Sequence, residues 1–293
     1  MAFESKNPVF QRVDGFNGKS RGGTAYAGYG DPSSWSTGSA ATVSGVQGGL
    51  QQPPTHTPTG TAGPMTIDST VQKTGITLAV LVVAAAATWV FTGDPTGIGN
   101  NADASAALYA LALVGALGGF ALAMVNSFKK VVSPALVIGY AVLEGVFIGA
   151  MSKVYQSAFG PGVVTGAVIG TIAAFAGTLA AYKFFDIQVT NKFRKWVTAA
   201  MFGFVGLILL DVVLGFFGTA IGFNGFGGLG LLMSVVGLGL GVLMLILDFD
   251  FVERGVAAGL PERESWRAAF GLTVTIVWIY IELLRILSIL RSN

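Results

Sequence analysis

Seven apolar runs, each near the roughly 20 residues that a helix needs to cross hydrocarbon, dominate this 293-residue sequence. No water inside a bilayer can bind exposed backbone groups, so a spanning segment must be a helix or a strand of a closed barrel. Barrel strands are short and alternate in polarity, and these runs do not alternate. The sequence therefore predicts an all-α polytopic membrane protein, a seven-transmembrane helix bundle. The predicted spans are 74–92, 106–126, 133–152, 162–183, 196–218, 227–247 and 268–290.

The composition agrees with lipid as the main solvent and partner of the chain. Apolar residues make up 53% of it and charged residues 11%, whereas a soluble domain carries roughly a quarter charged residues. The chain has no Cys, and its one His is His56 in the polar N-terminal region, so we expect no cofactor, no fixed metal and no enzymatic nucleophile. The formal net charge of +2 gives no argument for a nucleic-acid partner.

Two regions of different character follow one another along the chain. Residues 1–70 are rich in Gly, Ser, Thr and Pro, and such a stretch cannot bury enough apolar surface to offset its chain entropy. We expect a disordered cytoplasmic tail over 1–70 and the seven-helix transmembrane domain over 71–293.

Loop charges predict the orientation. Basic residues concentrate in alternate loops, and cytoplasmic loops carry the excess of Lys and Arg. We therefore expect a multi-pass protein of the cell membrane, with the N-terminus in the cytoplasm and the C-terminus on the opposite side. Lys153 is the exception to the alternation. The loop groups are Lys129 and Lys130; Lys183, Lys192, Arg194 and Lys195; and Arg254, Arg263 and Arg267.

Pairs of glycines four residues apart occur inside the spans. Small residues at this spacing let two helix backbones approach closely in lipid. We expect helix contacts at these positions. The pairs are Gly115/Gly119, Gly145/Gly149, Gly166/Gly170 and Gly237/Gly241.

A few charged residues enter the apolar spans, and these are the candidate functional residues. A carboxylate at a helix centre costs about 2.5–3.5 kcal/mol on insertion scales. Counted along their spans, Glu144, Asp211 and Glu282 fall near mid-membrane, where they could meet if their helices are neighbours. Two carboxyl groups in contact titrate as a unit, so such a pair can sense pH, relay protons or bind a divalent cation.

Local interpretations of the same residues remain open. Glu282 and Arg285 are three residues apart and can neutralise each other on one helix face. Asp211 and Glu144 can each hydrogen-bond a neighbouring helix without any role in transport. In the acidic segment after the sixth span, Asp250 can pair with Arg254 on a solvated face.

Two segments of the last third resemble a known family. They are Asp248-Phe-Asp-Phe-Val-Glu-Arg and Trp278-Ile-Tyr-Ile-Glu282-Leu-Leu-Arg285-Ile-Leu. They resemble the Bax-inhibitor-motif (YccA-like) family, in a bacterial branch with a Gly/Ser-rich tail. The resemblance covers roughly residues 70–293.

The resemblance implies six helices around a central seventh and a pH-sensitive calcium leak. It also implies a proton sensor in which an Asp ending the sixth helix pairs with an Asp of the seventh. Asp248 matches the first position. Alignment on Tyr280-Ile-Glu282 places the partner at Glu282, the position we favour, with transient calcium at Asp248 and Glu282. Alignment on the Leu-Leu-Arg ending places it at Thr275, which would remove the acidic pair.

Three functions remain in competition. The first is a cation (calcium) leak gated by protonation of intramembrane carboxylates, with calcium ions and protons as partners. The second is a non-transporting regulator that binds another membrane protein or a protease. The third is a proton-coupled secondary transporter, which intramembrane acids also suit.

Overall fold

The computed structural model describes residues 63–93 and 102–292. The predicted tail lies outside them, up to residue 62. Seven helices, each long and apolar enough to cross a membrane, make up the described chain. They are α1 (Ile67–Phe91), α2 (Ala102–Phe128), α3 (Pro134–Phe159), α4 (Val163–Phe184), α5 (Asn191–Phe216), α6 (Gly228–Ala257) and α7 (Glu264–Ser292). The predicted helical membrane bundle is confirmed.

Local signals set several helix ends. Thr66 and Ser69 form a reciprocal capping box at the start of α1, so this helix begins before the predicted boundary at residue 70. Pro134 stands in the first turn of α3, where its missing N–H costs no hydrogen bond. Helix α6 runs well past the predicted end at 247, so the expectation that Asp248 stands where the sixth span meets its loop is wrong: it lies inside the helix.

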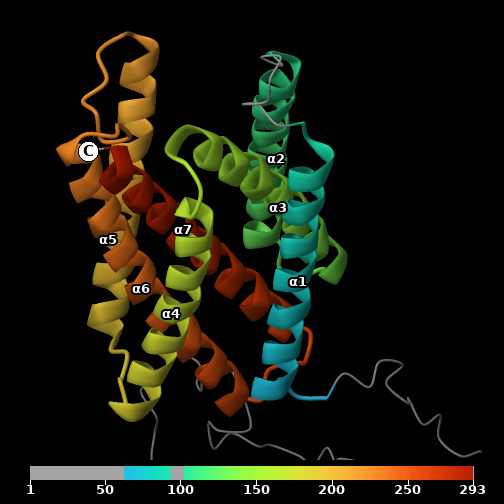
Figure 1. Cartoon of the computed structure of the whole chain (residues 1–293). Coiled ribbons are helices and arrows are strands. Elements are labelled where there is room, and N and C mark those ends of the chain that lie inside the picture. Colours follow the sequence, from blue (N-terminus) through green and yellow to red (C-terminus); the bar gives the residue numbers. More distant parts are fainter. Residues whose placement is uncertain (1–62, 94–101, 293) are drawn as a thin grey trace, which may run out of the picture. The chain divides into compact units, whose positions relative to one another are not determined.

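Helix α7 is the central element of the bundle. It packs against α1, α3, α4 and α6 and is the most buried of the seven candidate spans. Among the described helices, α2 packs only on α3 and α5 packs only on α6, so each of these two helices lies at the outside of the bundle. Figure 1 shows α7 in red crossing between the other helices.

All of the predicted glycine pairs lie at helix contacts. A Cβ atom added at Gly145 would lie 2.7 Å from Ala84 Cβ of α1, and one at Gly149 would lie 2.9 Å from Ala85 Cα. The other three pairs face α3 or α7 in the same way. The absent side chains therefore set how closely these helices approach.

Charged side chains tie the alternate loops together at one end of the bundle. Lys73 forms an ion pair with Glu262 at 2.9 Å, which joins the start of α1 to the α6–α7 loop. Arg254 donates to the Val189 carbonyl at 2.7 Å, and Arg267 donates to the Lys130 carbonyl at 2.9 Å. The predicted grouping of the basic loops at one end is confirmed.

Lys153, the exception in the charge pattern, has a local explanation at the other end. Its ammonium donates to the carbonyls of Trp89 and Thr92 at the C-terminus of α1. The last carbonyls of a helix lack intrahelical partners and carry partial negative charge. Lys153 is therefore a cap on α1.

The glycine contacts give a stability prediction. Gly149→Ala should lower the free energy of unfolding by about 1–3 kcal/mol, because the added methyl group overpacks the α1–α3 contact. Gly177→Ala is the matched control, since a Cβ there meets nothing within 4 Å. Thermal unfolding in detergent would measure both, and equal unfolding temperatures would contradict the close α1–α3 approach.

Candidate functional site

Asp248 and Thr275 form the polar contact between α6 and α7. The Thr275 hydroxyl donates to Asp248 Oδ2 at 2.6 Å, a length typical of a hydrogen bond to an ionised carboxylate. The Asp248 side chain is half-buried, and Thr275 is buried. Asp248 is thus a membrane acid whose partner carries no charge.

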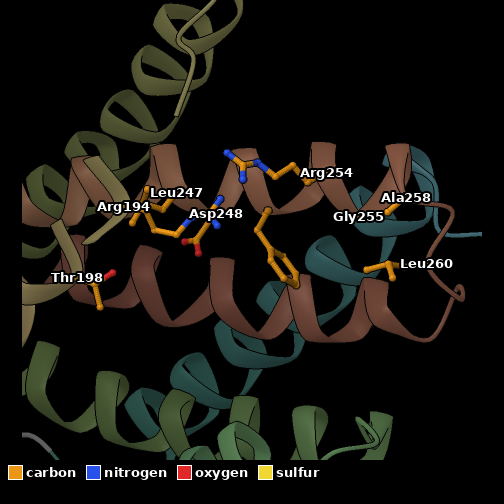
Figure 2. Close-up of a pocket in the computed structure, with 9 residues that line it drawn as sticks. Arg194, Thr198, Leu247, Asp248, Arg254, Gly255, Ala258 and Leu260 are labelled. Carbon is orange, nitrogen blue, oxygen red and sulfur yellow. The ribbon is translucent and has the colours of Figure 1, made fainter. Parts of the chain in front are cut away.

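Asp248 lines two separate cavities. The larger, of about 490 Å³, lies beside α5 and α6 and includes Arg194, Thr198 and Arg254 in its lining. The smaller, of about 300 Å³, lies between the end of α2 and the α6–α7 pair. Asp248 and Phe251 line both, and Figure 2 draws Asp248 between the ribbons of α6 and α7. This one carboxylate therefore borders both cavities.

Glu282 does not contact Asp248, so the favoured pairing is wrong. Thr275, about two helical turns or roughly 10 Å earlier on α7, occupies the position opposite Asp248. The Glu282 carboxylate instead packs on α6, where a Cβ at Gly237 would lie 2.6 Å from Glu282 Oε1. Glu282 is 6% exposed, and its Oε2 has no hydrogen-bond partner. Two residues seven apart share a helix face, so the sequence pattern alone could not separate the two alignments.

Arg285 hydrogen-bonds the α5–α6 loop and does not form an ion pair with Glu282. Its guanidinium donates to the carbonyls of Phe223 and Gly225, in the α5–α6 loop. The ion pairs of the described residues do not include Glu282 with Arg285. A direct ion pair between Glu282 and Arg285 is therefore not found among the described residues.

The Asp211 carboxylate accepts hydrogen bonds from the same α5–α6 loop and so holds that loop in place. Its Oδ1 accepts from the backbone N–H groups of Ile221 and Gly222 at 2.7 and 2.9 Å. Its Oδ2 accepts from the backbone N–H and the side-chain amide of Asn224 at 2.8 and 3.1 Å. Asp211 stands in the last turns of α5, so its predicted mid-membrane position is wrong.

Glu144 lies in a third interface. A Cβ at Gly119 of α2 would come within 2.8 Å of Glu144 Oε2, which places the carboxylate at the α2–α3 contact. Asp211, Glu144 and Glu282 thus belong to different helix contacts. The expectation that these three acids meet at one level is wrong.

Asp250 forms the centre of an ion-pair group. It accepts from Arg254 at 2.9 Å, as the spacing predicted, and from Arg194 of α5 at 2.6 Å. The pairing with Arg254 is confirmed, but Asp250 is buried rather than on a solvated face. The second arginine neutralises the buried carboxylate and joins α5 to α6.

Sequence reasoning missed Asn126. This residue ends the predicted span 106–126, and its side chain is 4% exposed and lines the smaller cavity beside Asp248. In the sequence, Asn126 is an amide at the end of an apolar run, and an uncharged amide indicates a functional site less strongly than a charged residue does. In the described part of the chain, no group of three or more His, Cys, Asp or Glu side chains is placed to hold a metal ion.

Comparison with known proteins decides the family. A family profile described as "Bax inhibitor 1 like" matches residues 7–292. The chain belongs to this family. It is also similar to an uncharacterized protein of Chlamydia muridarum (strain MoPn / Nigg), with 28% identity over 158 residues. That match covers 52% of this chain and 63% of the relative.

Membership in the Bax inhibitor 1 like family confirms the resemblance drawn from the segments around Asp248 and Glu282. The geometry favours the alignment in which Thr275 takes the second position of the acidic pair. At the Asp248 contact between α6 and α7, this member of the family therefore has one carboxylate and one hydroxyl.

The role of Asp211 gives a second stability prediction. Asp211→Ala should lower the free energy of unfolding by about 1–3 kcal/mol, because the loop N–H groups lose their acceptor. Asp211→Asn keeps one carbonyl oxygen and should cost less. Thermal unfolding measures both. A wild-type unfolding temperature for Asp211→Ala would contradict the structural role.

Proposed function

We propose that this protein is a passive, proton-sensitive cation leak, with calcium as the expected cation and Asp248 as the residue that carries the effect. The observation behind the proposal is that one carboxylate with an uncharged partner borders two cavities. An ionised carboxylate in a cavity of a membrane protein attracts cations and marks an ion pathway. A proton bound to Asp248 would remove that attraction.

Apolar side chains fill the contact between α6 and α7 beyond Asp248. Leu245 of α6 and Ile279 of α7 are fully buried, and a Cβ at Gly241 would lie 2.8 Å from Ile279 Cγ1. An apolar constriction of this kind can stop ions by excluding water. The leak therefore requires α6 and α7 to separate here, and a ligand or proton that favours the separated state shifts the population toward it.

Calcium flux from proteoliposomes tests this proposal. The wild-type leak should fall as pH falls, because protons compete with the cation for Asp248. Asp248→Asn should reduce the flux toward the liposome background and remove its pH dependence. Glu282→Gln removes another intramembrane carboxylate and should leave the pH dependence in place, as should Thr275→Val, which keeps the Asp248 charge.

The outcome that would overturn the leak is equally direct. If Asp248→Asn keeps both the flux and its pH response, then Asp248 is not the proton-sensitive group. If the wild-type protein gives no flux above empty liposomes at any pH, then the protein is not a leak.

We infer that the protein lies in the cell membrane and that the end of the bundle with the basic loops faces the cytoplasm. The inference rests on the Lys and Arg content of those loops. The chain has no Cys, so single introduced cysteines can report the side. In intact cells a membrane-impermeant maleimide should label Ala220→Cys, which lies in the α5–α6 loop. It should label Lys130→Cys, which lies in the α2–α3 loop, only after permeabilisation. The reverse pattern would invert the topology.

A further inference from the structure

The larger cavity, of about 490 Å³, lies beside α5 and α6 and has a lining of mixed character. Among the described helices, α5 contacts only α6, so no other helix packs against the sides of α5. The lining combines two arginines, Arg194 of α5 and Arg254 of α6, with apolar side chains, and Figure 2 shows the lining residues around the cavity. A cavity that joins cationic and apolar groups suits an amphiphilic molecule. The apolar lining residues include Leu247, Phe251, Ala258 and Leu260.

Arg194 and Arg254 share a single carboxylate. Arg194 Nη2 donates to Asp250 Oδ2 at 2.6 Å, and Arg254 Nε donates to Asp250 Oδ1 at 2.9 Å. Two positive charges against one negative charge leave this group with an excess of one positive charge. The arginine side chains are 42% and 47% exposed, whereas the Asp250 side chain is 8% exposed. The accessible side of the group is therefore cationic, and each guanidinium keeps N–H donors beyond those that bind Asp250.

Trp196 marks the level of the membrane surface near Arg194. It is 76% exposed, and tryptophans on the outside of membrane proteins concentrate at the level of the lipid headgroups. Arg194 lies two residues before Trp196 near the start of α5, where Lys192 and Lys195 are exposed as well. Basic residues at this level attract anionic lipids. The arginines of the cavity therefore lie at the depth where lipid phosphates lie.

We propose that this cavity binds one anionic phospholipid, of the phosphatidylglycerol type, from the leaflet on the side of the basic loops, with its phosphate on Arg194 and Arg254. Guanidinium groups suit phosphate because their planar fork presents parallel N–H donors. The glycerol and the first acyl carbons would pack on Leu247 and Phe251, which line the same cavity. The lipid would then join α5 to α6. This inference goes beyond the proposed leak and does not depend on it.

Asp248 favours a lipid over a free phosphate ion as the occupant. It lines the same cavity, and on α6 it stands six residues before Arg254, about 9 Å deeper along the helix axis. A free anion that entered the cavity would meet the negative charge of Asp248. A lipid keeps its phosphate at the membrane surface and places uncharged carbons deeper, so it uses the arginines without approaching that carboxylate.

Native mass spectrometry of the full chain, exchanged into equimolar phosphatidylglycerol and phosphatidylcholine, tests the inference. The wild-type protein should retain one phosphatidylglycerol per chain in preference to phosphatidylcholine. Arg194→Gln and Arg254→Gln should each weaken this retention by about 10-fold, the effect of losing one hydrogen bond to a charged group. Arg263→Gln is the matched control, because it removes an exposed arginine from the α6–α7 loop at the same end of the bundle. It should retain the lipid as the wild type does.

A second pair of variants separates the cavity from general attraction to the basic loops. Thr198 lines the cavity one helical turn after Arg194, whereas the neighbouring Ala199 is exposed and does not line it. Thr198→Trp should fill the cavity and abolish the preference for phosphatidylglycerol while every charge stays in place. Ala199→Trp should keep the preference. This pair decides if the arginine variants fail to fold, because it leaves the ion pairs with Asp250 intact.

Several results would overturn the lipid site. Equal retention of the two lipids would remove its headgroup preference. Wild-type retention in Thr198→Trp, or a loss in Arg263→Gln as large as that in Arg194→Gln, would leave only general attraction to the basic loops. Release of the bound lipid by excess inorganic phosphate would make the cavity a site for a free anion. Selective lipid retention in a protein that conducts no calcium would overturn the leak and leave the lipid site standing.

Discussion

The close contact between α6 and α7 is the interaction on which the rest of the candidate site depends. Glycines on α6 allow the two helices to approach closely, because side chains of α7 occupy the space where a Cβ at Gly237 or Gly241 would lie. Lipid gives little hydrophobic drive for one helix to bind another, so association depends on this packing and on interhelical hydrogen bonds. The contact holds Asp248 against Thr275 and holds Glu282 two turns away. Along the α6–α7 contact, the buried apolar side chains of Leu245 and Ile279 thus lie between the polar pair Asp248–Thr275 and Glu282.

The ends of the bundle are fixed by electrostatics. At one end, the Asp250 group and the contacts of Lys73 and Arg267 join loops that are distant in the sequence. At the other end, Asp211 accepts the N–H groups of the α5–α6 loop while Arg285 binds its carbonyls. A charge near the membrane is costly unless it is paired or hydrogen-bonded. The charges at the two ends therefore act as structural ties, whereas Asp248 lines two cavities.

The candidate site was predictable only in part. Asp248 stood out because a carboxylate near an apolar span is rare. Its partner could not be chosen, since Thr275 and Glu282 lie on the same face of α7 and differ only in depth. Depth depends on the relative axial position of α6 and α7, which their glycine contacts set. Asn126 carried little signal, because an amide becomes informative only when it is buried and unpaired.

The sequence by itself determined the number of helices, their approximate spans, the alternation of basic loops and the glycine positions where helices meet. These follow from local hydropathy, helix capping and residue size, which each segment carries with it. Only the tertiary structure decided which acids meet which partners, and that cavities open at Asp248. The physical reason is that a hydrogen bond requires its atoms to lie within about 3 Å, whereas neighbouring positions along a helix face differ in depth by about 4.5–6 Å. The spacing of residues within one helix does not specify how far that helix is shifted along its axis relative to a neighbouring helix.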